Sequence, residues 1–498
     1  MTAKIRIGVL CDMHLPADKN SPQYAFLRKA VERMHRDGVH TLICLGDITG
    51  YGEMEAWNLY LEAVKGFTHY EVIGNSDVRD AATRDIIMSY VQEAEFRAGD
   101  RRVIGINTPD GVISAEDRKR LEGIRDRDIV FLHHYVQSLK EESRNWLTEL
   151  AERVAVVILH GHGHRHFDYY IHNTHVLGMR GLDPDKAIGN FPCFNYLDIA
   201  DCQVSMEERL VEIPKDIIRE VGNYFGIACA DNTNDLIYAT EHSIKYVEIR
   251  CKAEKGAEWE PDRALLPIVN KWREETAGYL SVHMPNLKFR EGTVTGKETW
   301  LQALEYAIEL GADSLTMHPP RVPVCEMPKD GPVWQEFLEM YTTVAKRVPV
   351  TTKLGVENMH KNTNEVLDET RGFGYLPEEV AGWIDAINME LGSERVGHVL
   401  DVGHARNNGD FAKQYPVSKW YSLMGKRIIA YHIHQVVPLE NGLKNHQAIE
   451  NWFGPMINYT SFFYAWNQGM LNYAPVFLEV RGKENYEKSI KACKLDLF

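Results

Sequence analysis

Residues 154–164 read VAVVILHGHGH, a run of apolar, strand-forming residues followed by two glycine–histidine pairs. Buried strands that release polar residues at their carboxyl ends are how α/β folds build sites. The same arrangement occurs upstream, with helical patterns between the runs IRIGVLCD, HTLICLGD, HYEVIGN, RRVIGIN and DIVFLHH. The first 200 or so residues therefore predict an α/β domain, which the β-rich stretch from 170 to 213 closes.

A second series of strand candidates follows the charged segment SMEERLVEIPKDIIRE. Its members are YFGIACA, KYVEIRC, YLSVHMP, DSLTMHPP, KLGVENM, VGHVLDVGH, IIAYHIHQ and PVFLEVRG. Helical stretches such as 299–310, 333–346 and 377–391 lie between them. Eight strand–helix units over roughly 280 residues match a (β/α)₈ barrel, in which the carboxyl ends of the strands carry the chemistry. We therefore predict two domains, residues 1–213 and 214–498.

The composition is that of an ordinary globular protein. The chain has 498 residues, of which 44% are hydrophobic and 26% charged, and its formal net charge is −15. That length favours two to three domains. The acidic balance argues against a broad basic surface for duplex DNA, so nucleic acid remains a partner that is not favoured.

Neither membrane insertion nor secretion is expected. No apolar stretch approaches the roughly 18 residues of a membrane span, and the start MTAKIRIGVLCDMH has no secretory pattern. The eight cysteines are scattered without a CxxC pair, and Cys11, Cys44, Cys229 and Cys251 lie in strand-like runs. We expect a soluble, cytoplasmic protein with reduced, buried thiols and no membrane partner.

Five short motifs follow strands in the first half. They are Asp12-Met13-His14, Gly46-Asp47, Gly74-Asn75, His133-His134 and Gly161-His162-Gly163-His164. We expect a central sheet to bring all five to one edge. Carboxylate, imidazole and amide oxygen are ligands that divalent ions accept. A pair of ions about 3.5–4 Å apart needs a shared carboxylate and suits phosphoryl transfer.

This set resembles the calcineurin-like metallophosphoesterases over roughly residues 5–200. The resemblance implies a β-sandwich with flanking helices and a two-metal site (Mn, Fe, Zn or Ni) that hydrolyses a phosphate ester. It implies that Asp12, His14 and His164 hold one metal. Asn75, His133 and His162 would hold the other, with Asp47 bridging, and His134 is the alternative to His133. Asp47, Asn75 and His162 are the implied catalytic residues.

One departure narrows the expected substrate. Many members of that family place a histidine after Gly-Asn to protonate the leaving group, whereas this chain reads Gly74-Asn75-Ser76-Asp77. The form resembles a compact branch with a GNCD motif, some members of which cleave phosphodiesters. A phosphodiester substrate is therefore favoured over a monoester. The alternative is a metal-binding scaffold without catalytic activity.

Acids and imidazoles also end the strands of the predicted barrel. They are Glu248, His283, His318, Glu357, Asp401, His404, His432, His434, His446 and Glu479. Burying so many polar groups unpaired would cost several kcal/mol each, so a metal site is the economical explanation. Glu248 and Arg250 leave one strand together, and they either contact a substrate hydroxyl or phosphate or form a buried pair at the rim.

The order of these residues resembles the xylose isomerase-like TIM barrels over about residues 220–490. This superfamily includes endonuclease IV and sugar epimerases. The residues that match the four ligands of one divalent metal (Mn, Zn or Mg) in the epimerases are Glu357, Asp401, His432 and Glu479. The two glutamates would also be the acid–base pair that moves a proton beside a carbonyl, and His404 would contact substrate.

The endonuclease IV branch uses further histidines for additional metals. His283, His318 and His404 are present, and His446 could supply the histidine of a D-x-H motif, although Lys444 replaces the aspartate. A lysine there would repel an ion and argues against a full three-metal site. These four histidines are therefore expected to contact substrate or an additional metal.

Together these observations predict a two-domain metal-dependent phosphoesterase. Its substrate would be a phosphodiester or sugar phosphate, and its barrel would resemble a sugar isomerase or epimerase. The alternatives are a nuclease or a DNA-repair or defence enzyme that uses both domains on nucleic acid, and a metal-stabilised scaffold without activity. We expect a small phosphorylated or sugar-like partner, and a homo-oligomer is compatible with such barrels.

Overall fold

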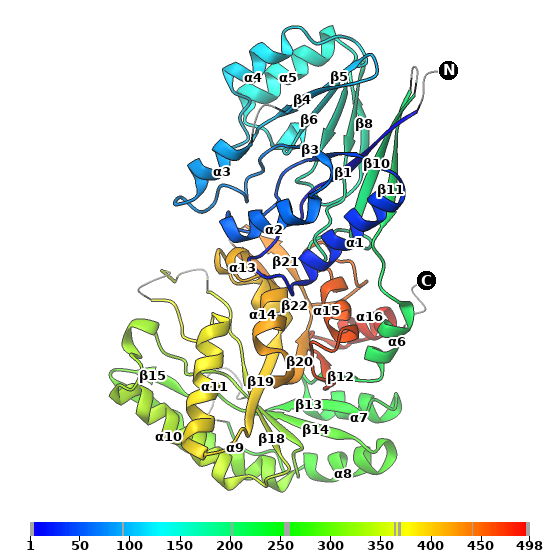
Figure 1. Cartoon of the computed structure of the whole chain (residues 1–498). Coiled ribbons are helices and arrows are strands. Elements are labelled where there is room, and N and C mark those ends of the chain that lie inside the picture. The colour runs from blue at the N-terminus through cyan, green and yellow to red at the C-terminus, as the bar shows by residue number, and fades with distance from the viewer. Residues whose placement is uncertain are drawn as a thin grey trace. The chain divides into compact units, whose positions relative to one another are not determined.

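The computed structural model describes residues 4–91, 94–200, 203–252, 259–362, 365–366, 370–440 and 442–494. The chain divides into two compact units (Figure 1). The first comprises Met1–Ile213 with Asn458–Ser461, and the second comprises Pro214–Ile457 with Phe462–Phe498.

The first unit contains two sheets. One has the order β11-β10-β1-β2-β3, with strands β1 (Ile5–Leu10), β2 (Thr41–Cys44), β3 (Thr68–Glu71), β10 (Cys193–Ala200) and β11 (Gln203–Leu210). The other has the order β4-β5-β6-β7-β9-β8, with strands β4 (Glu95–Ala98), β5 (Arg101–Ile106), β6 (Ile129–Leu132), β7 (Val157–His160), β8 (Phe167–Ile171) and β9 (Thr174–Gly178). Strands β1, β2 and β3 run parallel, as do β5, β6 and β7.

The two sheets pack face to face over an apolar core. Ile7 and Val9 of β1 meet Ile129 and Phe131 of β6 in one buried cluster. The alternate residues of β6, Val130 among them, belong to a second cluster, because successive side chains of a strand point to opposite faces. The second sheet is thus apolar on both faces, as a sandwich with flanking helices requires.

Five α-helices and one 3₁₀ turn complete the described part of this unit. They are α1 (Pro22–Arg36), α2 (Met54–Val64), α3 (Arg84–Tyr90), α4 (Ala115–Leu121), η1 (Val136–Ser138) and α5 (Glu141–Arg153). Ser21 caps α1 by accepting from Tyr24 N, and Ser114 caps α4 by accepting from Asp117 N.

The second unit contains a closed barrel of parallel strands in chain order. Its members are β12 (Phe225–Ala228), β13 (Tyr246–Arg250), β14 (Tyr279–His283), β17 (Ser314–Met317), β18 (Lys353–Glu357), β19 (Val396–Asp401), β20 (Ile428–Ile433) and β23 (Val476–Leu478). All eight predicted strands are present, and each predicted helical stretch overlaps a helix. The α/β fold class, a sandwich followed by a TIM barrel, is confirmed.

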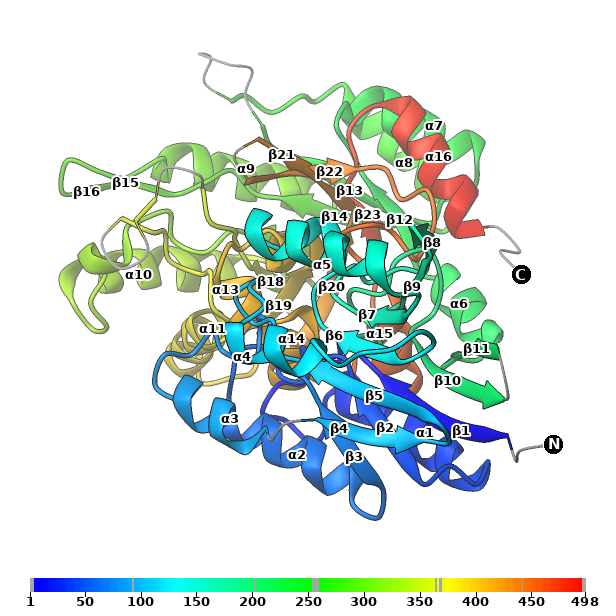
Figure 2. The same ribbon diagram turned by 90° about the horizontal axis from the view of Figure 1, so that it is seen from above.

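Helices follow the barrel strands, and two hairpins are inserted between them. The helices are α6 (Lys215–Gly222), α7 (Asn232–Glu241), α8 (Leu265–Thr276), α9 (Lys297–Glu309), α10 (Pro332–Arg347), α11 (Pro377–Leu391), α12 (Val402–Arg406), α13 (Phe411–Gln414), α14 (Val417–Met424), α15 (Thr460–Asn467) and α16 (Lys483–Lys494), with 3₁₀ turns η2 (Val324–Glu326) and η3 (Gly425–Arg427). The hairpins pair β15 (Lys288–Arg290) with β16 (Thr293–Thr295), and β21 (Gln435–Leu439) with β22 (Gly442–Gln447). The β15–β16 hairpin projects beyond the barrel strands (Figure 2).

The fold bears on three expectations, which concern the sheets of the first unit, the cysteines and membrane spans. The expected single central sheet is wrong, because β1, β2 and β3 belong to one sheet and β6 and β7 to the other. Cys11, Cys44, Cys229 and Cys251 are buried and free; Cys202 lies outside the described residues. None of the helices within the described ranges combines the length and the apolar character that crossing a bilayer demands.

Candidate metal centres

The loops that follow β1, β2 and β7 hold their polar residues in a left-handed backbone conformation. The residues with positive φ are Asp12 (48°), His14 (45°), Asp47 (51°), His162 (64°) and His164 (52°). This conformation costs a non-glycine residue about 1–3 kcal/mol and tends to occur at functional sites. Five such residues, all from the predicted motifs, indicate loops that the fold constrains in order to position side chains.

Asp47 lies between two groups of imidazoles. Its Oδ2 is 3.2 Å from Nε2 of His14, and its Oδ1 is 3.4 Å from Nε2 of His133. The backbone N–H of Ser76 donates to Oδ1 at 2.8 Å and orients the carboxylate. Asp47 is almost fully buried. A carboxylate that turns one oxygen to each group has the geometry of a bridging ligand.

His133, Asn75 and His162 gather on the Oδ1 side of Asp47. Nδ1 of His133 donates to the carbonyl of Leu45 at 2.8 Å, which directs Nε2 to the site. That Nε2 lies 3.1 Å from Oδ1 of Asn75 and 3.0 Å from Nδ1 of His162. The candidate ligand atoms of Asp47, His133 and His162 all lie within 4.8 Å of one another. Lone pairs that converge in this way fit a divalent cation.

His134, the alternative to His133, has a different environment. Its Nδ1 lies 3.3 Å from Oγ1 of Thr108, and its ring lies beside that of His162 with centroids 4.4 Å apart. Burial lowers the pKa of His134 to about 3, and the neighbouring His133 and His162 lower it further. The structure therefore brings His133 into the candidate metal-binding group and places His134 next to that group.

Asp12, His14 and His164 are the other predicted ligands, and their ligand atoms do not form one compact group as those of Asp47, His133 and His162 do. The backbone N–H of His162 donates to both oxygens of Asp12, at 3.1 and 3.0 Å. The rings of His14 and His164 stack with centroids 5.1 Å apart. Nδ1 of His164 is buried and makes no hydrogen bond with any described residue. Burial lowers the pKa of His14 to about 3 and that of His164 well below its usual value, so both rings favour the neutral form that binds metals.

The sequence interpretation assigned no role to two nearby acids. Asp77 accepts hydrogen bonds from Thr49 N at 2.8 Å and Gly74 N at 3.0 Å, and thereby joins the loops that carry Asp47 and Asn75. Asp183 lies 3.6 Å from Nδ1 of His14. Asp77 lies two residues after Asn75 in the sequence, and this position could have indicated a role at the site. No local pattern marks Asp183, because its proximity to His14 arises only in the folded chain.

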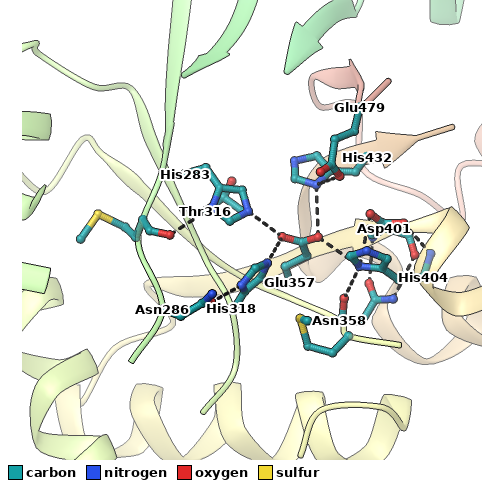
Figure 3. A network of polar contacts seen from close by, with 12 residues as sticks. His283, Asn286, Thr316, His318, Glu357, Asn358, Asp401, His404, His432 and Glu479 are labelled. Carbon is teal, nitrogen blue, oxygen red and sulfur yellow. Dashed lines mark hydrogen bonds and ion pairs between the residues drawn. The ribbon is translucent and has the colours of Figure 1, made fainter. Parts of the chain in front are cut away.

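Glu357, at the end of β18, is the hub of the barrel site (Figure 3). Its Oε2 lies 3.1 Å from Nε2 of His283 and 3.3 Å from Nε2 of His318. Its Oε1 lies 3.3 Å from Nδ1 of His404 and 3.4 Å from Nδ1 of His432. One buried carboxylate thus faces four predicted histidines from four different strand ends.

The four residues predicted to hold the barrel metal meet at this hub. The ligand atoms of Glu357, Asp401, His432 and Glu479 lie within 4.8 Å of one another. Three of their buried oxygens make no hydrogen bond with any described residue, namely Oε1 of Glu357, Oδ2 of Asp401 and Oε2 of Glu479. Three carboxylates this close repel one another without a cation between them. The donor set therefore fits a divalent metal.

His434 extends the cluster in a way that the sequence interpretation did not assign. Its Nε2 lies 3.2 Å from Oδ1 of Asp401, and its ring centroid is 4.6 Å from that of His446. It forms one compact group with Asp401 and His404, and another with His446 and Glu479. Lys444, which replaces the expected aspartate, is exposed. An imidazole from the end of β20 thus lies beside His446.

Glu248 and Arg250 are not paired with each other. Glu248 accepts hydrogen bonds from Oγ of Ser281 at 2.9 Å and Oγ1 of Thr316 at 2.6 Å, and its Oε1 lies 3.0 Å from Nε2 of His432. Arg250 instead pairs with Glu479. The rim pair considered from the sequence therefore forms with a different glutamate, Glu479, because Glu248 is held by Ser281, Thr316 and His432.

A cavity of about 810 Å³ lies against this cluster. His283, His318, His404, His446 and Glu479 line part of it. Asn358 fixes the backbone of Asp401, since its amide donates to Asp401 O at 2.9 Å and accepts from Asp401 N at 2.8 Å. The volume lies in the range of small-molecule sites, about 300–1,000 Å³.

Comparison with known proteins assigns both units. The family model described as a xylose isomerase-like TIM barrel matches residues 238–494, just over half of the chain. The model of the calcineurin-like phosphoesterase superfamily domain matches residues 5–178. A search of curated proteins finds no match.

Solved structures of both kinds are similar to parts of the chain. A dimetal phosphatase from Danio rerio is 13% identical, with 41% of this chain and 96% of that chain covered and a TM-score of 0.34. A D-tagatose 3-epimerase-like protein is 19% identical, with 53% and 94% covered and a TM-score of 0.36. A xylose isomerase domain protein from Planctomyces limnophilus is 10% identical, with 54% and 92% covered and a TM-score of 0.34. On the family matches, the chain belongs to the xylose isomerase-like TIM barrels and carries a calcineurin-like phosphoesterase domain ahead of its barrel.

Proposed function

We propose that the chain is a metal-dependent phosphodiesterase whose barrel handles a sugar or polyol. The observation that carries the first part is the position of Asp47, whose two oxygens face His14 and His133 at 3.2 and 3.4 Å. Two divalent ions held there would supply Lewis-acid activation of water and of the phosphate ester. Asp12, His14 and His164 would hold one ion, and Asn75, His133 and His162 the other.

The protein's own residues prepare this site. Asp77 and the N–H of Ser76 fix the loops and the carboxylate orientation. The Ser76 hydroxyl is buried and makes no hydrogen bond with a described residue, and serine is no proton donor comparable to the histidine found there in many relatives. An ester whose leaving group needs little protonation suits the site best, and this supports a phosphodiester over an alkyl monoester.

In the barrel, Glu357 and Glu479 are the proposed acid–base pair. Both approach Nδ1 of His432, at 3.4 and 3.1 Å, and Glu479 also lines the cavity. Two carboxylates at one metal position could remove and return a proton beside a carbonyl, which is isomerase or epimerase chemistry. The metal would polarise that carbonyl.

The first test is hydrolysis of bis(4-nitrophenyl) phosphate by the full chain supplied with Mn²⁺. We expect hydrolysis by the wild type and by Asp100→Asn, a matched change of an exposed aspartate in the turn between β4 and β5. The rate of hydrolysis by Asp47→Asn should be at least about 100-fold lower, because both ions would share that carboxylate. Absence of hydrolysis in the wild type under Mn²⁺, Zn²⁺, Ni²⁺ and Fe²⁺ would favour the scaffold alternative.

A nuclease acting through the barrel is a second candidate, favoured by one observation. His434 lies beside His446 and Asp401, so it could replace the ligand that Lys444 removes from an endonuclease IV-like pattern. This candidate predicts incision of a duplex that contains an abasic site, and loss of that incision in Glu357→Gln. The acidic net charge of the chain, −15, weighs against it.

A further inference from the structure

The wall of the barrel cavity carries a charge opposite to that of the whole protein. The chain has 71 acidic and 56 basic residues. Among the residues that the structure describes, the cavity is nevertheless lined by five basic side chains and a single carboxylate, that of Glu479. The basic residues are Arg250, Lys252, Lys288, Arg290 and Arg481. The described lining of this cavity thus reverses the overall charge bias next to the candidate metal centre.

Two of these cations are fixed on one face of a hairpin. Lys288 and Arg290 are alternate residues of β15, so their side chains point the same way, whereas Phe289 between them does not line the cavity. The pairing of Lys288 with Thr295 and of Arg290 with Thr293 holds the strand in register. The hairpin therefore presents a lysine and an arginine side by side to the cavity.

The other cations come from the barrel rim. Lys252 follows β13 and Arg481 follows β23, and both strands neighbour β12 in the barrel. Arg250 already pairs with Glu479. By contrast, Lys252, Lys288, Arg290 and Arg481 form no ion pair with any residue that the structure describes. Four positive charges are thus available to a ligand.

We propose that the barrel cavity binds a sugar bearing a phosphate group, with Lys288, Arg290, Lys252 and Arg481 as the phosphate subsite. Charge-assisted hydrogen bonds from arginine and lysine are the strong way to hold a phosphate. The histidines and the Glu479 carboxylate that also line the cavity would receive the polyol or carbonyl part. The inference rests on the proposed sugar-handling role of the barrel. It adds that the sugar carries a negatively charged phosphate group.

The test is calorimetric titration of the full, Mn²⁺-loaded chain with D-fructose 6-phosphate, D-fructose, inorganic phosphate and a ten-nucleotide single strand. We expect fructose 6-phosphate to bind at least about tenfold more tightly than fructose. The double variant Lys288→Ala/Arg290→Ala should lose most of that advantage while its affinity for fructose stays within about twofold. Lys271→Ala, an exposed lysine of α8, is the matched control and should leave both affinities unchanged.

Several results would overturn the proposal. They are equal affinity for the sugar with and without phosphate, an unchanged affinity for fructose 6-phosphate in the double variant, and tighter binding of the oligonucleotide through the same residues. If the double variant melts early, Arg290→Gln alone should shift the affinity in the same direction. Hydrolysis of bis(4-nitrophenyl) phosphate in the same wild-type samples separates the outcomes. If the protein hydrolyses the diester but binds no sugar ligand, only the barrel proposal is refuted. If it binds the sugar phosphate but does not hydrolyse the diester, only the phosphodiesterase proposal is refuted.

Discussion

Nε2 of His14 lies 3.2 Å from Oδ2 of Asp47, the carboxylate oxygen that faces away from His133. The two imidazoles come from loops after β1 and β6, which belong to different sheets. The carboxylate between them therefore depends on the packing of the whole sandwich. Changes that move Asp47 without altering its charge should disturb both halves of the site.

Gly74→Ala is such a change. A Cβ at residue 74 would lie 2.2 Å from Oδ1 and 2.4 Å from the backbone N of Asp47, which is closer than atoms can approach. We expect hydrolysis of the chromogenic diester to fall at least about tenfold, because the bridging carboxylate must shift. Steady-state kinetics and a thermal melt measure the two effects.

Gly382→Ala is the matched control for that substitution. Gly382 lies in α11, is exposed, and has open space where a Cβ would be. Alanine there should raise stability by about 0.5–1 kcal/mol and leave hydrolysis unchanged. If Gly74→Ala leaves hydrolysis unchanged, as this control should, the close approach of residue 74 to Asp47 does not matter for activity.

Glu248→Gln should weaken metal binding in the barrel only. Glu248 lies 3.0 Å from Nε2 of His432 and holds that nitrogen, so that Nδ1 faces Glu357 and Glu479. Loss of such a partner typically costs a metal site about 10–100-fold in affinity. Competition titration with a chromogenic chelator measures this loss, with Glu390→Gln on the exposed face of α11 as the control. Unchanged affinity would show that Glu248 is only a packing residue.

Gly403→Ala tests the role of His434. A Cβ at residue 403 would overlap the His434 ring, with Cε1 at 1.9 Å and Nε2 at 2.3 Å. The ring must then leave Asp401. If His434 holds a metal, the barrel should lose about one bound ion while the sandwich keeps its own. A wild-type metal count in the variant would exclude His434 as a ligand.

Acid stability should depend in part on Asp198. Its hydrogen bonds with Arg6, at 2.8 and 2.7 Å, lower the pKa of this carboxyl group below its usual value, and Lys4 adds to the effect. A lowered folded-state pKa means that the stabilisation is present above the unfolded pKa, about 3.9, and is lost as the pH falls through the folded value. Asp198→Asn should therefore be less stable than the wild type at pH 6 and lose less stability on acidification to pH 3. If the melting temperatures of the two proteins fall by the same amount between pH 6 and pH 3, this prediction is refuted.

The barrel strands could be predicted from the sequence because each is a short apolar run that ends in a polar residue. The motif histidines and acids were visible for the same reason, and the structure places Glu357 at the centre of four of them. The division of the first unit into two sheets could not be predicted from these runs. Strand pairing such as that of β1 with β10 joins residues about 190 positions apart and leaves no local signal.

A similar reason explains why the roles of some site residues could not be predicted from the sequence. Glu248 and His434 stood at predicted strand ends, but their partners, His432 and Asp401, come from other strands. Barrel closure alone decides which strand ends meet. Likewise, the cations of the cavity wall come from a hairpin and two strand ends, so no contiguous basic run marked them in an acidic chain.

The most direct test of two separate metal centres is the metal content per chain, measured by plasma mass spectrometry on protein purified without chelator and supplied with Mn²⁺ or Zn²⁺. Asp47→Asn should lose about two ions and keep those of the barrel, whereas Glu357→Gln should keep two and lose the rest. Asp100→Asn and Glu390→Gln should match the wild type. A wild type without metal, or an Asp47→Asn variant with its full metal content, would contradict the account.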